Sequence, residues 1–140
     1  MPAKDTWEQR IQAVTNGGME AVVDATIERW ITTEGRNRLP GQVELIRQMI
    51  LNTPVQGFVA CSEAIKAMDM RITNPKISAP TLVICGEQDT GTTPQQAKEI
   101  ADAIPNAKLE LISDAAHLAN IEQHEVFNSL LSAFLGDLDI

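Results

Sequence analysis

One short stretch constrains the fold more than any other part of the sequence. Thr81–Cys85 is an apolar run, preceded by Ala79-Pro80 and followed by Gly86. A run of this length between turn residues is typical of a strand buried on both faces of a parallel sheet. We therefore expect an α/β fold around this strand.

The rest of the second half predicts one more strand and two helices. Thr93-Pro94 with Gln96 has the form of a helical capping box, and the helix that it begins ends before Pro105. Lys108–Ser113 then predicts a strand, and a last helix carries Val126 through Phe134. Strand, helix, strand, helix is a right-handed crossover unit with a parallel pair at its centre. Two parallel strands leave edges with unpaired backbone groups, so we expect other strands to pair with them.

Residues 1–75 have the period of helices, and the clearest helical pattern runs over Met19–Ile31. A basic loop around Arg36 and Arg38 follows. Short amphipathic helices of this kind form either a small bundle or a cover over another part of a protein. The sequence thus predicts two regions, a helical one over 1–75 and an α/β one over 76–140.

The charge balance argues against nucleic-acid partners. Eleven Lys and Arg stand against nineteen Asp and Glu, giving a formal net charge of −8. The excess lies in the second half, because residues 1–72 hold eight basic and nine acidic groups and 73–140 hold three and ten. A chain this acidic repels phosphate backbones.

The cysteines and the hydropathy predict a cytoplasmic protein. Cys61 and Cys85 are the two cysteines, and their spacing fits neither a C-x-x-C motif nor a small disulfide framework, so we expect reduced core thiols. The residues after Met1 lack the pattern of a secretion signal, and no run of about 18 apolar residues occurs. We expect no membrane partner.

An acid and a base follow the two predicted strands. Asp89 lies four residues after Cys85, and His117 lies four residues after Ser113. The carboxyl ends of parallel strands meet at one edge, where ligands bind, so we expect the two side chains to lie together. A carboxylate on one imidazole nitrogen fixes the tautomer and lets the other nitrogen take a proton from a nucleophile. The alternatives are a solvated loop histidine and, with Asp114, a metal site.

The order of acid and then base is that of α/β-hydrolases after their serine. Ala79–Asp89, Ile104–Ala107 and Ala115–Glu122 resemble the C-terminal part of that superfamily. Gly18–Trp30 and Gly57–Asp69 are similar to the lid of the 3-oxoadipate enol-lactonases. The resemblance covers nearly the whole chain. It implies a helical lid over 1–75 and, over 76–140, the C-terminal part of an α/β-hydrolase core.

The family hydrolyses the enol lactone of 3-oxoadipate in aromatic degradation (the β-ketoadipate pathway), with a Ser-His-Asp triad and without a cofactor. By position, Asp89 matches the acid and His117 the base, with Ala116 where many relatives have glycine. The family's serine lies in a G-x-S-x-G turn before the lid. The serines of this chain lack that setting: Ser62, Ser78, Ser113, Ser129 and Ser132. The 140 residues alone are therefore expected to be inactive.

The resemblance also suggests substrate contacts. Trp30 either lines the pocket or packs as an ordinary helix residue. An anionic lactone or ester calls for a cation, and Arg29 and Arg71 are the candidates, although either could be a surface charge.

Two other functions stay open. The chain could be an association module, whose strand edges pair with a second copy or with an N-terminal half. It could also perform related chemistry on the same scaffold, as a cofactor-free haloperoxidase or a carbon–carbon bond hydrolase.

Overall fold

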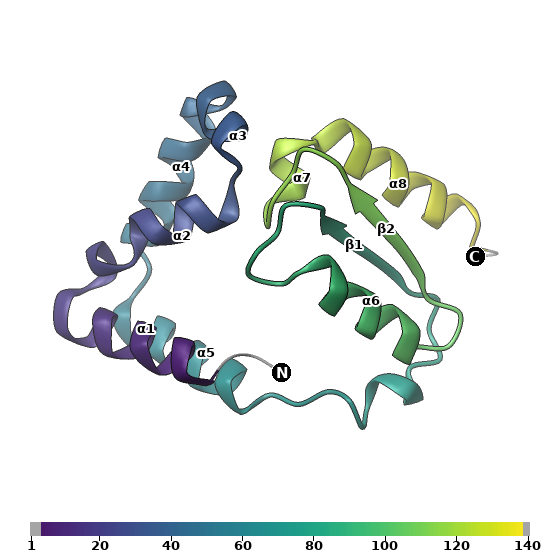
Figure 1. Cartoon of the computed structure of the whole chain (residues 1–140), viewed down its shortest axis with the longest axis horizontal. Coiled ribbons are helices and arrows are strands. Elements are labelled where there is room, and N and C mark those ends of the chain that lie inside the picture. Colours follow the sequence, from purple (N-terminus) through teal and green to yellow (C-terminus); the bar gives the residue numbers. More distant parts are fainter. Residues whose placement is uncertain (1–3, 139–140) are drawn as a thin grey trace. The chain divides into compact units, whose positions relative to one another are not determined.

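The computed structural model describes residues 4–138, and Figure 1 shows the arrangement of their elements. In chain order these are α1 (Lys4–Gly17), the 3-10 turn η1 (Met19–Ala21), α2 (Val23–Trp30), α3 (Thr33–Arg38), α4 (Pro40–Leu51), α5 (Val55–Ala67), the 3-10 turn η2 (Asn74–Lys76), β1 (Leu82–Gly86), α6 (Pro94–Ala103), β2 (Lys108–Ile112), α7 (Ala119–Glu122) and α8 (His124–Gly136).

The chain divides into two compact units. The first contains the chain up to Glu28 together with Pro40–Met70, and the second contains Arg29–Leu39 together with the chain from Arg71 onward. Arg29–Leu39 thus belongs with the strands, although helices of the first unit flank it in sequence. The functional division at residue 75 into lid and core stays a prediction.

The first unit is helical, with α1 packed against α5. Ile11 and Val14 are buried on the inner side of α1. The expected continuous helix from Met19 to Ile31 is wrong in its first turn. Gly18 has a φ of 69°, which glycine adopts readily, and a 3-10 turn precedes the helix proper. Among the described residues, no helix has the length and apolar character needed to span a membrane.

The predicted strand pair of the second unit is confirmed. β1 and β2 are parallel, in register from Leu82 opposite Lys108 to Gly86 opposite Ile112. Helices α6 and α8 both contact the two strands and lie on either side of them in Figure 1. The core cluster of the second unit consists of three buried residues, Ile112, Ala115 and Ala119. Partly buried apolar side chains pack against it: Ile84, Phe127 and Leu130.

Local signals at helix ends were partly right. The capping box at α6 is present, because Thr93 Oγ1 accepts from Gln96 N–H and the Gln96 side chain accepts from Thr93 N–H. The basic loop predicted around Arg36 and Arg38 is instead the short helix α3. Its N-cap is Thr32, whose hydroxyl oxygen accepts from the backbone of Gly35 at 2.9 Å.

Both cysteines are free thiols in this structure, but only one lies in a core. Cys85 is buried in β1, whereas Cys61 is exposed on α5, so the expectation of a core position for Cys61 is wrong. The helical period of the sequence places Cys61 on one face of the helix, but it does not tell whether that face packs against another element.

Candidate active site

The loops after β1 and β2 lie against each other at the carboxyl end of the strands. Backbone N–H groups of the first loop donate to the second, from Glu87 to the Ile112 carbonyl and from Gln88 to the Ala115 carbonyl, each at 2.9 Å. A Cβ at Gly86 would collide with the carbonyl oxygens of Ala115 and Ala116. Glycine at this position therefore permits the two loops to touch.

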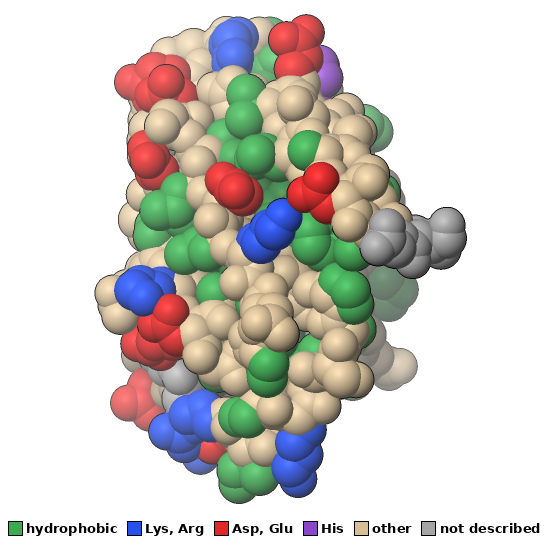
Figure 2. Space-filling model, turned by 90° about the vertical axis from the view of Figure 1, so that its right-hand side faces the viewer, with side chains coloured by type: hydrophobic (Ala, Val, Ile, Leu, Met, Phe, Trp, Pro, Cys, Tyr) green, Lys and Arg blue, Asp and Glu red, His purple; other side chains and the backbone are tan. Residues whose placement is uncertain are grey.

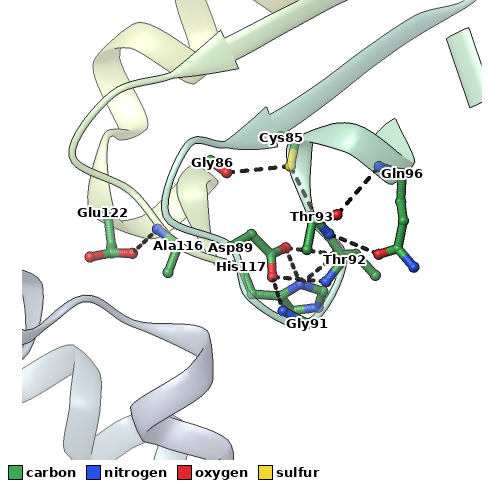
Figure 3. A network of polar contacts seen from close by, with 10 residues as sticks. All are labelled: Cys85, Gly86, Asp89, Gly91, Thr92, Thr93, Gln96, Ala116, His117 and Glu122. Carbon is green, nitrogen blue, oxygen red and sulfur yellow. Dashed lines mark hydrogen bonds and ion pairs between the residues drawn. The ribbon is translucent and has the colours of Figure 1, made fainter. Parts of the chain in front are cut away.

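This contact brings Asp89 and His117 together, as the strand order predicted. His117 Nδ1 lies 2.8 Å from Asp89 Oδ2 (Figure 3). The imidazole is at the exposed rim, whereas Asp89 is only 5% exposed. The proximity is confirmed, and the catalytic roles of the two residues stay a prediction.

Four donors converge on the Asp89 carboxylate. Its Oδ1 accepts from the backbone N–H groups of Gly91 (2.8 Å) and Thr92 (3.0 Å). Its Oδ2 accepts from the Thr92 hydroxyl (2.7 Å) and faces His117 Nδ1. Burial alone raises the pKa of Asp89, but hydrogen bonds from the Thr92 side chain and backbone, from His117 and from the Gly91 backbone lower it below its ordinary value.

The electrostatics of the pair select one imidazole tautomer. An ionised carboxylate only accepts hydrogen bonds, so His117 Nδ1 carries the proton and Nε2 keeps its lone pair. Within residues 4–138, both hydrogen-bond contacts of the His117 ring are made through Nδ1, to Asp89 and to the Thr92 hydroxyl at 3.1 Å. The arrangement can accept a proton at Nε2 and hold the resulting imidazolium beside a carboxylate.

Thr92 is a residue of the candidate site that the sequence did not predict. Its hydroxyl and backbone account for two of the four donors on Asp89. The signal was present as Asp89-Thr90-Gly91-Thr92, because an aspartate side chain in such a turn commonly accepts the N–H groups two and three residues on.

Trp30 lies against the predicted base. Its ring is stacked on that of His117, with centroids 5.8 Å apart and planes 26° apart. The carbonyl of Trp30 also accepts from the Leu118 backbone N–H at 2.9 Å. Trp30 is therefore a contact of the Asp89–His117 site, and its role in substrate binding stays a prediction.

The two predicted cations lie in different places. The Arg29 side chain is partly buried, and a Cβ on Gly91 would lie 3.1 Å from its Cδ. Burial lowers the pKa of Arg29, while the charge of Asp89 opposes that effect. Arg71 is exposed in the turn between α5 and η2, and its assignment as a substrate ligand stays a prediction.

The metal-site alternative and a cavity of the described residues can each be placed relative to the Asp89–His117 pair. No group of three His, Cys, Asp or Glu among them is placed to hold a metal ion, so Asp114 does not complete a ligand set with Asp89 and His117. A shallow cavity of about 240 Å³ lies at the amino ends of the strands, near Thr81 and Lys108. Ligands of parallel sheets bind at the opposite, carboxyl ends.

Comparisons with known proteins agree with this geometry. A family model described as the alpha/beta hydrolase fold matches residues 4–123. The curated protein "3-oxoadipate enol-lactonase 1" of Acinetobacter baylyi is 33% identical over 135 residues, which are 96% of this chain and 50% of that protein.

Solved structures of related enzymes also match most of this chain. The enol-lactonase from Burkholderia xenovorans has a TM-score of 0.92 and 35% identity, covering 95% of this chain and 51% of that one. A bromoperoxidase from Bacillus anthracis has a TM-score of 0.82 and 27% identity, covering 95% and 49%. The chain spans about half the length of the relatives it matches.

Proposed function

The chain belongs to the α/β-hydrolase family, and we propose that it supplies the acid and the base of a serine hydrolase that opens an enol lactone. The observation that carries this proposal is the 2.8 Å contact between His117 Nδ1 and a buried, fully hydrogen-bonded Asp89. In this family the serine lies in a G-x-S-x-G turn ahead of the acid and the base. The serine and the backbone donors for the oxyanion come from the part of the fold that this chain does not span.

The proposed reaction uses His117 twice. Nε2 takes the serine proton as the serine oxygen forms a bond to the lactone carbonyl carbon. The ring C–O bond then breaks, and the imidazolium returns the proton to the leaving enol oxygen. Water hydrolyses the acyl-enzyme by the same route. Asp89 stays ionised throughout and stabilises the imidazolium, as its lowered pKa favours.

Two neighbours of the pair fit an anionic substrate. Arg29 provides a positive charge close to the Asp89 loop, and guanidinium binds carboxylates in a forked geometry. Trp30 presents an apolar ring beside His117. We assign both to substrate binding, with Arg71 as a further candidate. As part of the same proposal, the enzyme acts in aromatic degradation in the cytoplasm and uses no cofactor.

The proposal is tested with a hybrid hydrolase, in which the first half of 3-oxoadipate enol-lactonase 1 of Acinetobacter baylyi is joined to this chain. We expect the hybrid to hydrolyse the enol lactone of 3-oxoadipate and the 140-residue chain alone to show background rates. A cooperatively folded hybrid without turnover contradicts the proposal. So does turnover by the chain alone that survives loss of His117.

The similarity to a bromoperoxidase favours a second candidate chemistry. The same hybrid, given peroxide and bromide with a carboxylic acid buffer, tests it. Halogenation faster than lactone opening would move the assignment from lactonase to cofactor-free haloperoxidase. The third chemistry, carbon–carbon bond hydrolysis, is tested by giving the hybrid a diketone substrate and measuring its cleavage.

The strand edges support a further proposal, that this chain associates through its sheet. β1 and β2 pair only with each other among the described residues, so each has one edge without a ladder. Figure 2 looks onto the side where α8 and β2 lie, and apolar side chains are visible between charged ones. Large apolar side chains on α6, β2 and α8 are more than a third exposed: Ile100, Leu111, Val126, Leu131 and Leu135.

We expect the chain to self-associate at micromolar concentration or to bind the nucleophile-bearing half of the fold. Sedimentation velocity measures this. Leu111→Lys on β2 is expected to weaken association, whereas Leu45→Lys, at an exposed site of the first unit, is the control. The proposal is contradicted if the chain sediments as a monomer and also does not bind the nucleophile-bearing half of the fold.

A further inference from the structure

We propose that Glu122 is a positioning residue, whose buried side chain holds His117 and Trp30 in one stacked arrangement. The residue lies in α7, follows His117 in the chain and hydrogen bonds through its side chain to Thr32 and Ala116. Its importance for catalysis rests on the proposed hydrolase function, but its effect on the two rings can be measured without any reaction.

The Glu122 side chain joins two segments that are distant in sequence. It is only 2% exposed. Its Oε1 accepts from the backbone N–H of Thr32 at 3.0 Å and from the Thr32 hydroxyl at 2.6 Å. Its Oε2 accepts from the backbone N–H of Ala116 at 2.7 Å (Figure 3). One carboxylate oxygen therefore binds the segment after Trp30, and the other binds the residue before His117.

These contacts fix the backbone on both sides of the base. Ala116 is held by Glu122, and the Leu118 N–H is held by the Trp30 carbonyl at 2.9 Å. Thr32, the other partner of Glu122, lies two residues after Trp30. The loop with the base and the segment with the indole ring are thus tied together at two points, and the rings stack between them.

The surroundings of Glu122 are built around its carboxylate. Its backbone carbonyl accepts from Arg38 Nη2 at 2.8 Å, which adds a contact from the end of α3. A Cβ at Gly35 would collide with Glu122 Oε1, so glycine leaves space for the buried oxygen. A buried carboxylate is tolerated when donors satisfy it, and Thr32 and Ala116 supply them.

The charges that face His117 come from other residues. Asp89 contacts its Nδ1, and Arg29 lies near Gly91 of the Asp89 loop. Glu122 is connected to the base through its hydrogen bond with the backbone of Ala116. A change at Glu122 is therefore expected to move the imidazole relative to the indole while its direct charged partner remains.

The experiment follows the fluorescence of Trp30 in the chain itself. Trp7→Phe removes the other tryptophan. Imidazolium quenches an adjacent indole, so we expect Trp30 emission to be weaker at about pH 5 than at about pH 8. Glu122→Gln offers an N–H₂ group to an N–H donor in place of one oxygen, and we expect most of the pH-dependent quenching to be lost.

Matched variants separate positioning from general destabilisation. Thr32→Ser keeps the hydroxyl and is expected to keep the quenching, whereas Thr32→Val removes it and is expected to lose quenching as Glu122→Gln does. His117→Gln should abolish the response, and His124→Gln should leave it unchanged. If Glu122→Gln does not fold, the Thr32 pair decides the question.

The proposal is overturned if cooperatively folded Glu122→Gln or Thr32→Val retains the full response, or if His117→Gln does. Quenching that depends on Glu122 in a chain whose hybrid hydrolyses nothing would support the positioning role and contradict only the hydrolase function. In an active hybrid, Glu122→Gln is expected to lower kcat because the base is displaced, whereas Thr32→Ser is expected to keep kcat.

Discussion

Replacement of His117 by alanine is expected to lower the kcat of the hybrid hydrolase by about 10²- to 10⁴-fold, the usual contribution of a positioned general base. Without the imidazole the serine proton has no acceptor, and Asp89 cannot replace it because the carboxylate is buried and turned toward Nδ1. Steady-state kinetics on the enol lactone measure the effect. KM should change little, because the substrate contacts assigned to Arg29 and Trp30 remain.

His124→Ala is the matched control for that experiment. His124 is exposed at the start of α8, and it is the other histidine of the chain. We expect its removal to leave kcat at the parent value. Equal losses from both variants, or no loss from His117→Ala in a folded hybrid, would contradict the assignment of His117 as the base.

Asp89→Asn is expected to cost about as much as loss of the base, of order 10⁴ in kcat by analogy with the same change in serine-protease triads. The Asn carbonyl can take the place of Oδ1, which accepts from Gly91 and Thr92. The amide N–H₂ group then faces His117 Nδ1 and forces that nitrogen to accept. The ring proton moves to Nε2, which can no longer receive the serine proton.

The control for Asp89→Asn is Asp114→Asn. Asp114 is exposed with a φ of 54°, a conformation that asparagine tolerates well. We expect this variant to keep full activity. A near-normal rate for Asp89→Asn would show that the carboxylate does not set the tautomer of the base.

Asp89→Asn is also expected to change how the stability of the folded chain depends on pH. The pKa of Asp89 is depressed in the folded chain, so its charge contributes stability that is complete above the unfolded pKa, about 3.9, and is lost as the pH falls through the lower folded pKa. The difference in Tm between the parent chain and Asp89→Asn should be largest near neutral pH and shrink below about pH 4. Circular dichroism melts measure it, and a difference independent of pH contradicts the assignment.

Local patterns in the sequence determined the strand pair, the capping box of α6 and the common edge of Asp89 and His117. Each of these follows from short-range rules. An apolar run forms a buried strand, a threonine caps a helix, and parallel strands present their carboxyl ends together. The membership in the α/β-hydrolases follows from the same stretches, because they contain the residues that the fold requires.

The tertiary structure alone decided which segment accompanies the base. Arg29–Leu39 lies in sequence between helices of the first unit, and the sequence predicted a basic loop around Arg36 and Arg38. The segment nevertheless belongs to the unit of the strands, where Thr32 and Arg38 bind Glu122. Contacts between residues 90 positions apart leave no periodic trace in a sequence, and periodicity reveals an apolar face without its partner. The stacking of Trp30 on His117 and the buried carboxylate that fixes it therefore became visible only once the chain was folded.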